Sequence, residues 1–382
     1  MSAAPPPPCS VVGIVGGGQL ARMMAEAAAD IGLEVIVLDP TPDCPAREFA
    51  GQIVGEFDDR AKLAELARRC DVVTLDIEAV HAESLTILEQ SGTRVAPGAR
   101  VLGIIQDKLL QKEFLRQHGL PTSEFAAVGN GNSSIVAFGL PCVVKARRHG
   151  YDGRGVKVVR ELHDAADLLA APCMVERLVN IDKELATMVA RNARGEIAHY
   201  PVVEAEFDAR ANILNIIQAP ARISAKIASQ CTELARRIVT AIEGVGIFGI
   251  EFFLDRNGQL LVNEISPRPH NSGHYTIEAC ATSQFEQHLR AVTNLPLGPT
   301  TLVHPAASFN LLGEPSAFGI PNITGLDVAA ATPGAAVHLY GKHSVKPFRK
   351  MGHVTVTGKT LEAALSSAQA LKQVVKVMGH PP

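Results

Sequence analysis

Residues 247–265 read IFGIEFFLDRNGQLLVNEI, which is two apolar runs joined by the turn sequence Asp255-Arg-Asn-Gly258. An Asn-Gly pair between runs rich in β-branched and aromatic residues is a strong signal for a β-hairpin. Each run carries one carboxylate, Glu251 in the first and Glu264 in the second. A two-residue turn at Asn257-Gly258 places the two carboxylates directly opposite each other. A four-residue loop leaves them diagonal on one face, and only an odd shift in register separates them.

This pair of acids predicts a metal site. Like charges side by side on two strands repel each other by some tenths of a kcal/mol up to about 1 kcal/mol. A divalent cation reverses the sign of that interaction, and carboxylate oxygens completed by phosphate oxygens are typical of Mg²⁺-nucleotide sites. We therefore expect Glu251 and Glu264 to bind Mg²⁺, with Mn²⁺ as a substitute, and a solvated polar face is the alternative.

The overall composition excludes several classes of protein. The chain has 382 residues, more than one ordinary core accommodates, and its net charge of −3 gives no basic field for nucleic acid or an anionic membrane. Trp is absent and aromatic residues make up only 4%, which argues against a base-stacking surface. No apolar stretch approaches the about 18 residues of a membrane span, and the N-terminus lacks the basic region of a secretory signal. Seven scattered cysteines form no C-x-x-C pair, so we expect reduced thiols in a cytoplasmic protein.

The pattern of elements changes along the chain. Apolar runs at residues 11–15, 34–38 and 71–75 alternate with helical patterns, which predicts βαβ units on a parallel sheet. From residue 142 onward short strands follow one another, which predicts an antiparallel α+β unit, and helices are expected over 225–242 and 276–292. We expect four units: a Rossmann-like domain over 1–105, a small central lid domain over 106–180, a mixed α+β domain with the acidic hairpin over 181–300, and a β-rich subdomain over 301–382.

A glycine-rich turn follows the first predicted strand. Residues Gly16-Gly-Gly-Gln-Leu-Ala21 fit the pattern G-x-G-x-x-A, and Asp39 lies about 20 residues further on. Such a turn exposes backbone amides at a helix N-terminus, where they bind phosphate, and the acidic residue can bind a ribose. The pattern indicates either a dinucleotide cofactor or a phosphate-bearing substrate, and a turn needed only for the fold is the third alternative.

A second glycine-rich segment, KARRHGYDGRGV, runs from Lys145 to Val156 between two predicted strands. It is not a Walker A loop, because no helix follows it. A flexible loop between strands, flanked by Lys145, Arg147 and Arg154, could fold over a triphosphate. An ordinary solvated hairpin is the alternative.

The segment after the acidic hairpin, Ser266-Pro-Arg-Pro-His-Asn-Ser-Gly-His274, is stiffened by two prolines. It presents Arg268, His270 and Asn271 beside the predicted metal. The planar arginine fork matches small oxyanions. The loop therefore predicts an oxyanion site, against the alternative of a structural histidine.

The C-terminal region carries a local excess of positive charge. Residues 328–361 contain no acidic residue and five basic ones, namely Lys342, Lys346, Arg349, Lys350 and Lys359. In a chain with a negative net charge this is a local anion site. A solvated basic surface or an RNA contact is the alternative.

Taken together and in order, these motifs resemble one family. They are residues 16–20, Lys145 with the loop 150–155, residues 263–274, residues 339–342 and residues 349–353. They are similar to the N5-carboxyaminoimidazole ribonucleotide synthetase family of ATP-grasp enzymes, and the likeness covers nearly the whole chain. The resemblance implies an ATP-grasp fold of mixed α/β and α+β class. It also implies carboxylation of 5-aminoimidazole ribonucleotide with ATP and bicarbonate, through carboxyphosphate, in purine biosynthesis.

The resemblance implies a set of ATP ligands. Lys108 and Lys145 would hold phosphates, with the loop 150–156 closing over them, and the segment 176–179 would face adenine. The metal ligands would be Glu251 and Glu264. The full expected ATP set is Lys108, Lys145, Gly150, Tyr151, Asp152, Gly153, Arg154, Gly155, Val156, Glu176, Arg177, Leu178, Val179, Glu184, Phe207, Asn263 and Glu264.

The resemblance also implies substrate and catalytic residues. Arg268, His270 and Asn271 would bind bicarbonate, and Asp152 would accept the proton of the substrate amine. The expected catalytic set consists of Asp152, Arg268, His270, Asn271 and Lys350. The expected contacts of the ribonucleotide are Gly18, Gln19, Leu20, Asp76, Glu78, Tyr151, Asp152, Arg154, Lys342, Arg349 and Lys350. A homodimer is expected, with the product passing to a separate mutase.

Some positions depart from the family pattern and keep other functions open. Asp76 is one methylene shorter than the usual glutamate, Ala79 lacks a polar head, Phe207 replaces a frequent histidine and His149 replaces a glycine. A non-catalytic nucleotide-binding paralogue is therefore one alternative. The others are an ATP-grasp ligase acting on a different ribonucleotide, and an NAD-dependent oxidoreductase based on the first glycine-rich turn.

Overall fold

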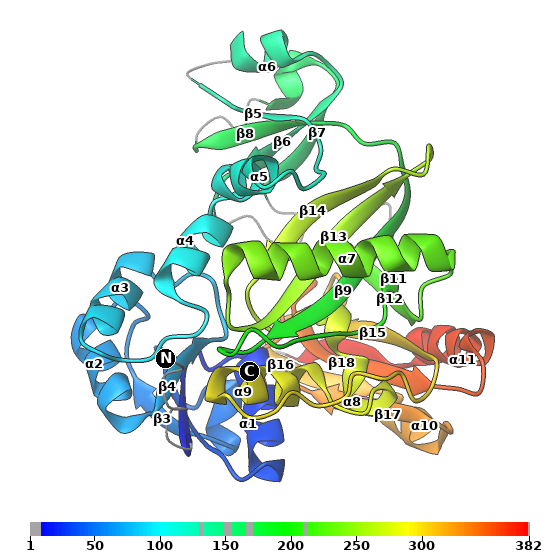
Figure 1. Cartoon of the computed structure of the whole chain (residues 1–382). Helices are drawn as coiled ribbons and strands as arrows, with labels where there is room; N and C mark the ends of the chain where they lie inside the picture. The colour runs from blue at the N-terminus through cyan, green and yellow to red at the C-terminus, as the bar shows by residue number, and fades with distance from the viewer. Residues whose placement is uncertain (1–8, 130–132, 149–154, 166–170, 209–212, 381–382) are drawn as a thin grey trace.

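The computed structural model describes residues 9–129, 133–148, 155–165, 171–208 and 213–380. Figure 1 shows an N-terminal α/β unit, a small sheet above it, and a large sheet that continues into the C-terminal region. In the part of the chain that the structure describes, no helix has both the length and the apolar character needed to cross a bilayer.

Four parallel strands form the N-terminal sheet, in the order β3-β2-β1-β4. Helix α1 packs on one face, and helices α2, α3 and α4 pack on the other. Burial on both faces explains why the strands read as continuous apolar runs, and it confirms the predicted parallel sheet. The prediction missed the short strand β3. The elements are β1 (Val11–Val15), α1 (Gln19–Asp30), β2 (Glu34–Asp39), η1 (Pro45–Glu48), β3 (Gly51–Val54), α2 (Arg60–Arg69), β4 (Val72–Leu75), α3 (Ala82–Gln90) and α4 (Ala99–Gln106).

The small sheet is antiparallel, in the order β5-β8-β6-β7. Its core is compact, because Ile135 of helix α6 packs on Val144 and Val175 of the two central strands. Helix α5 lies between this sheet and the rest of the molecule (Figure 1). The elements are α5 (Lys108–Gln117), β5 (Phe125–Ala127), α6 (Ser133–Phe138), β6 (Cys142–Ala146), β7 (Val156–Val159), η2 (Leu162–Ala165) and β8 (Cys173–Arg177).

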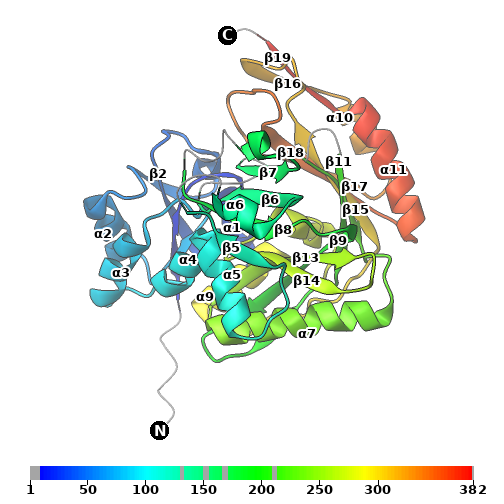
Figure 2. The ribbon, with the colours of Figure 1, turned by 90° about the horizontal axis from the view of Figure 1, so that it is seen from above.

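The large sheet runs in the order β14-β13-β9-β11-β12-β15-β18-β17, and β10 pairs with the edge of β9. Helix α7 lies across one face, where Leu234, Ile238 and Ile242 pack against Phe248 and neighbouring side chains. Figure 2 shows α7 beside β13 and β14, below the small sheet. The elements are β9 (Ile181–Arg191), β10 (Ile197–His199), β11 (Val203–Asp208), β12 (Ile213–Ala219), α7 (Ala225–Ile242), β13 (Gly246–Asp255) and β14 (Leu260–Ser266).

The large sheet extends across the unit boundary expected at residue 300. Strand β12 pairs with β15 through Ile217 and Ser308, and β15 pairs in turn with β18. In the C-terminal region, helix α11 packs on β15 and β18. The elements of this region are β15 (Ala306–Leu312), β16 (Ile320–Thr324), α10 (Leu326–Ala331), β17 (Ala335–Leu339), β18 (Lys350–Thr357), α11 (Leu361–Val374) and β19 (Lys376–His380), with β16 and β19 forming a separate pair.

The prediction of a single helix over residues 276–292 is wrong. The structure has η3 (Asn271–Gly273), α8 (Thr276–Ala279) and α9 (Gln284–Thr293), separated by an extended segment. Cys280 pairs with Leu302 in an isolated bridge, and the Ser283 hydroxyl accepts a hydrogen bond from the backbone amide of Glu286. A serine cap therefore starts a new helix where the apolar spacing alone predicts continuation.

Side chains alternate between the two faces of β13, so replacing two neighbouring phenylalanines by alanine is expected to lower the free energy of unfolding by different amounts. Phe252 is fully buried against α7, whereas Phe253 points to the other face and is partly exposed. Phe252→Ala is expected to lower the free energy of unfolding by about 3–5 kcal/mol. Phe253→Ala, the matched control, is expected to cost clearly less, as measured by denaturant unfolding. Equal losses would contradict the assignment of the two faces.

Candidate active site

The two acidic residues of the hairpin face each other as predicted, but for a different reason. Glu251 pairs directly with Glu264, while Phe252 pairs with Val262 and Leu254 with Leu260. The register near the turn is thus shifted by one residue, because Asp255 closes a three-residue loop with Gln259. A β-bulge between the two parts of the ladder restores the pairing.

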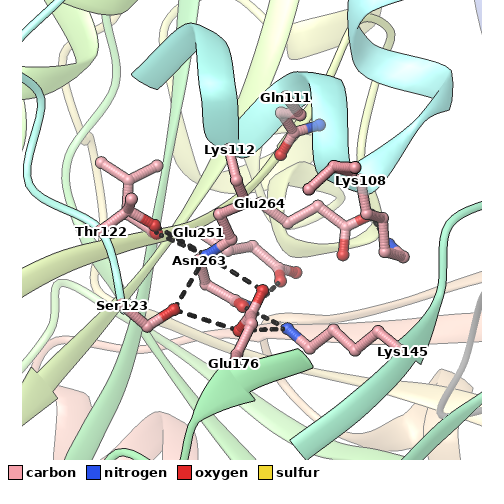
Figure 3. Close-up of polar contacts among 12 residues, drawn as sticks. Lys108, Gln111, Lys112, Thr122, Ser123, Lys145, Glu176, Glu251, Asn263 and Glu264 are labelled. Carbon is pink, nitrogen blue, oxygen red and sulfur yellow. Dashed lines mark hydrogen bonds and ion pairs between the residues drawn. The ribbon is translucent and has the colours of Figure 1, made fainter. Parts of the chain in front are cut away.

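The bulge leaves Asn263 as the extra residue of β14, beside Glu264. The Asn263 amide donates to Glu251 Oε2 at 3.3 Å, and its Oδ1 accepts from Lys145 Nζ at 3.3 Å. Glu264 forms an ion pair with Lys108. Figure 3 shows these side chains gathered between the hairpin and the small sheet. Consecutive residues Asn263 and Glu264 therefore both contribute to one site.

The two carboxylates have opposite electrostatic environments. Burial raises the pKa of Glu251 to about 7, and the neighbouring Glu264 and Glu184 carboxylates reinforce this effect. Burial also opposes ionisation of Glu264, but the Lys108 ammonium outweighs it and holds the pKa of Glu264 below its usual value. Glu184, on the adjacent strand β9, has its pKa raised to about 7 by burial. The Lys108 ammonium thus compensates the charge of Glu264, whereas among the described residues burial prevails over the lysines at Glu251 and Glu184.

Two lysines approach the hairpin from the small sheet and helix α5. Lys108 occupies the first turn of α5, where Asp107 caps the helix by accepting from the Leu109 amide at 3.0 Å. The same Asp107 carboxylate binds the Arg147 guanidinium through both oxygens, at 2.6–3.1 Å. Lys145 lies on β6 and contacts Glu176 Oε2 of β8 at 3.1 Å. The helix cap and the strand pairing together aim both ammonium groups at the acidic pair.

The loop after the hairpin is held by one buried glutamine. Gln284 accepts from the His270 amide at 2.9 Å and donates to the His270 carbonyl at 2.8 Å. Gly249 of β13 leaves room for this approach, because a Cβ there would lie 2.7 Å from His270 Cβ. His270 Nε2 lies 3.6 Å from Glu251 Oε1, and Asn271 begins η3. The sequence prediction missed Gln284, and the serine cap one residue before it is the signal that could have located it.

Arg268 is expected to bind bicarbonate and Glu78 to bind the ribonucleotide, and the structure places the two side chains next to each other. Arg268 Nε lies 3.2 Å from Glu78 Oε1. Glu78 is in the loop after β4, whose carbonyl groups accept from the Gln106 side chain. The N-terminal unit therefore meets the hairpin loop at this point, and the expected bicarbonate and ribonucleotide residues form one continuous surface.

The residues expected to bind the ribonucleotide are partly engaged with each other. The Gly18 amide donates to Asp76 Oδ2 at 2.7 Å and the Ala21 amide donates to Asp76 Oδ1 at 3.1 Å. Lys342 Nζ donates to Gln19 Oε1 at 2.9 Å and to the Lys350 carbonyl at 2.6 Å. Asp76 thus occupies two amides at the start of α1, while Gln19, Lys342 and Lys350 come together from both ends of the chain.

The remaining residues expected to bind ATP or the ribonucleotide are spread over several elements. Arg349 donates to the Ser344 carbonyl and hydroxyl, and Arg177 is turned outward, with its guanidinium bound to Glu124. Leu178 and Val179 connect β8 to β9, Phe207 lies at a bulge of β11, and Leu20 is buried in α1. Val156 pairs with Lys145, and Gly155 accepts from the Ala146 amide. Gly150, Tyr151, Asp152, Gly153 and Arg154 lie outside the described residues.

Asp39 is engaged in a way that argues against the dinucleotide alternative. Its Oδ2 accepts from the Gly17 amide at 2.8 Å and its Oδ1 accepts from the Thr41 amide at 2.8 Å. The side chain is buried at the end of β2. One oxygen therefore holds the glycine-rich turn and the other holds the loop after β2, so both are already engaged by backbone amides.

The donor set at the hairpin limits how a metal ion could bind. Within the described ranges, no group of three or more His, Cys, Asp or Glu side chains could hold an ion. Glu251 and Glu264 supply two carboxylates, so an ion there would need further oxygen ligands, such as nucleotide phosphates.

The raised pKa of Glu251 predicts a pH-dependent stability in the absence of divalent cations. The folded chain keeps the Glu251 proton up to a pKa of about 7, whereas the unfolded chain loses it near the ordinary value of 4.5. Ionisation is therefore unfavourable in the fold, and stability falls as the pH rises through this window. Glu251→Gln removes the titrating group. The Tm difference between this variant and the parent is therefore expected to be more favourable to the variant at about pH 8 than at about pH 5, measured in the presence of a chelator.

Glu264→Gln is the matched control for this prediction. Lys108 holds Glu264 ionised, so the replacement is expected to lower Tm at about pH 5. The loss is expected to be smaller at about pH 8, because the replacement also removes a carboxylate that raises the pKa of Glu251. Glu184 titrates in the same window as Glu251, so the Glu251→Gln variant keeps part of the pH dependence. An identical pH profile in parent and Glu251→Gln would contradict the prediction.

Comparison with known proteins places three family models along the chain. A ribonucleotide synthetase preATP-grasp domain matches residues 9–106, and an ATP-grasp domain matches residues 113–285. A phosphoribosylaminoimidazole carboxylase C-terminal domain matches residues 306–367. The second match contains Glu251, Glu264, Lys145 and Arg268, and the first and third contain Gln19 and Lys342.

Individual relatives are similar over the full length. The N5-carboxyaminoimidazole ribonucleotide synthase of Synechococcus elongatus is 40% identical over 394 residues, covering 100% of this chain and 98% of the relative. The structure of N5-carboxyaminoimidazole ribonucleotide synthetase from Thermotoga maritima matches with a TM-score of 0.90 and 47% identity, covering 97% of this chain and 100% of that one. The Aspergillus clavatus N5-carboxyaminoimidazole synthase, solved with ADP and 5-aminoimidazole ribonucleotide, matches with a TM-score of 0.86 and 35% identity, covering 95% and 98%.

Proposed function

The chain belongs to the N5-carboxyaminoimidazole ribonucleotide synthetase family, and we propose that it uses ATP and bicarbonate to carboxylate the amine of 5-aminoimidazole ribonucleotide. The observation that carries this proposal is the opposed pair Glu251 and Glu264. Lys108 pairs with Glu264, Lys145 contacts the adjacent Asn263, and His270 Nε2 lies 3.6 Å from Glu251 Oε1. The arrangement suits the transfer of a phosphoryl group to a small oxyanion.

A divalent ion fits the acidic pair, and Mg²⁺ is the ion we propose, with Mn²⁺ as a substitute. Burial and two other carboxylates oppose the ionisation of Glu251. An ion held by Glu251 and Glu264 would remove that repulsion and would supply charge stabilisation to the nucleotide phosphates. Asn263, bound to Glu251, would orient that carboxylate.

The first chemical step requires charge stabilisation and alignment. A bicarbonate oxygen attacks the γ-phosphorus of ATP, the bond from that phosphorus to the bridging oxygen breaks, and ADP leaves carboxyphosphate behind. Lys108 and Lys145 would stabilise the charge on the transferring phosphoryl group. Arg268, His270 and Asn271 would orient bicarbonate, and Gln284 fixes the backbone of His270 for that purpose.

The second step transfers the carboxyl group. The substrate amine attacks the carboxyl carbon of carboxyphosphate, or CO2 released from it, and phosphate leaves. Asp152 would accept the amine proton, with the segment 150–156 covering the site against water. Gln19, Lys342, Arg349 and Lys350 would bind the ribonucleotide. The contact between Lys342 and Gln19 supports this placement, because it joins the two ends of the chain at the substrate side.

Further properties stay proposals of the same kind. The fourfold division at residues 105, 180 and 300, the homodimer and a separate mutase that takes the product follow from the family resemblance. A cytoplasmic location is supported by the seven cysteines, which form no disulfide in the part of the chain that the structure describes. A non-catalytic paralogue is the second candidate function, favoured by Asp76, which occupies the Gly18 and Ala21 amides.

Turnover tests the proposed function. ADP release by the pure protein is expected to require both bicarbonate and 5-aminoimidazole ribonucleotide. Glu264→Gln is expected to reduce it by more than about 100-fold with an unchanged circular dichroism spectrum. The control is Glu233→Gln on the exposed face of α7, which is expected to keep the parent rate. Nucleotide binding without substrate-dependent ADP release would favour the non-catalytic paralogue.

A further inference from the structure

Lys112 is a buried cation that the proposed mechanism does not use. It lies on α5, one turn after Lys108, and only 2% of it is exposed. Its ammonium contacts Thr122 Oγ1 at 2.7 Å, Ser123 Oγ at 3.2 Å, the Val262 carbonyl at 3.3 Å and Glu176 Oε1 at 3.3 Å. Figure 3 shows the Lys112 nitrogen at the centre of these groups. A charge this deeply buried needs several such partners.

Glu176 lies between two lysines. Its Oε1 faces Lys112, while its Oε2 contacts Lys145 Nζ at 3.1 Å and the Ser123 hydroxyl at 3.1 Å. The carboxylate is also buried, so although the family resemblance counts Glu176 among the residues that face adenine, its side chain is held by the two lysines and Ser123 instead. Burial opposes its ionisation, but Lys145 and Lys112 outweigh burial and lower the pKa of Glu176 to about 2. One ionised carboxylate is therefore shared by two ammonium groups.

The charge balance of this triad has a consequence for Lys145. With both lysines present the triad carries a net charge of one positive unit. Lys145 also reaches Asn263 Oδ1, beside the acidic pair, so its ammonium borders the proposed phosphate site. Without Lys112, Glu176 would have Lys145 as its sole lysine partner among these contacts, and that pair would be neutral. The positive charge available to a phosphate depends on Lys112, although Lys112 lies behind Glu176.

Lys112 also lies where three segments meet. Glu176 belongs to β8 of the small sheet, Val262 belongs to β14 of the large sheet, and Thr122 precedes β5. Thr122 Oγ1 itself donates to the Val262 carbonyl at 2.7 Å, and the Val262 amide donates to Pro121. The ammonium thus holds the carboxylate of one sheet against the backbone of the other.

From these contacts we propose that Lys112 is a positioning residue for nucleotide binding: it neutralises Glu176, so that the charge of Lys145 is directed to the phosphates. This inference rests on the proposed function only in assuming that Lys145 binds nucleotide phosphate. It assigns no contact between Lys112 and the nucleotide. It predicts that nucleotide affinity follows the net charge of the triad rather than the number of intact contacts.

Three variants separate charge from contact. Lys112→Met leaves the triad neutral, Glu176→Gln leaves two positive charges, and the double variant restores the parent charge of one. Isothermal titration with MgADP is expected to show a loss of about 10-fold or more in Lys112→Met, and an affinity within about 3-fold of the parent in the double variant. Lys62→Met, which removes a surface lysine paired with Glu65, is the control and is expected to bind like the parent.

Adenosine provides the second readout. A charge effect acts on the phosphates, so Lys112→Met is expected to weaken MgADP while leaving competition by adenosine unchanged. A merely structural role would weaken both ligands, and would make the double variant at least as weak as Lys112→Met. Either of those results, or parent affinity in a folded Lys112→Met, would overturn the proposal.

The binding test remains decisive if the Lys112→Met variant does not fold, and also if the protein lacks the proposed activity. If Lys112→Met does not fold, the double variant decides, because it removes both partners of the buried Lys112–Glu176 ion pair and leaves Lys145 with Asn263. Parent-like affinity then supports the charge model, and a loss above about 10-fold contradicts it. The titrations contain no bicarbonate or ribonucleotide, so absent turnover would refute the carboxylation and leave this test intact.

Discussion

The opposition of Glu251 and Glu264 is the constraint on which the rest of the site depends. Two carboxylates on paired strands are unfavourable unless a cation joins them, and the fold nevertheless holds them there with a bulge. The bulge also adds Asn263 to the same side, where it bridges Glu251 and Lys145. A ladder without it would turn one carboxylate to the opposite face. One extra residue therefore decides whether the two carboxylates share one face of the hairpin.

The cations around that pair come from a different part of the fold. Lys108 starts α5, and Lys145 and Glu176 belong to the small sheet, so the site forms only where that sheet meets the large one. Lys112 is the buried link between the two surfaces. The same few contacts thus contribute both to the charge balance of the site and to the relative placement of the two sheets.

Sequence reasoning was most successful where chemistry and spacing agree. The apolar runs predict the parallel sheet and the hairpin, and the ordered motifs identify the family that the comparisons confirm. It could not foresee the three-residue turn and the bulge, because two shifts of one residue cancel in the final pairing. It also missed Lys112 and Gln284, since a polar residue on a helix reads as solvent-exposed until its buried partners are known. Asp39 had the right spacing for a ribose ligand, yet backbone amides occupy both of its oxygens.

The continuity of the large sheet has a further consequence. The matches to the ATP-grasp and C-terminal family models end and begin between β14 and β15, yet β12 and β15 are joined by ladder hydrogen bonds. Two segments that match separate family models are therefore joined in one continuous sheet. Exchanging the C-terminal module for that of a distant relative would have to preserve the edge of β12, since a mismatched neighbour would leave an open strand prone to aggregation.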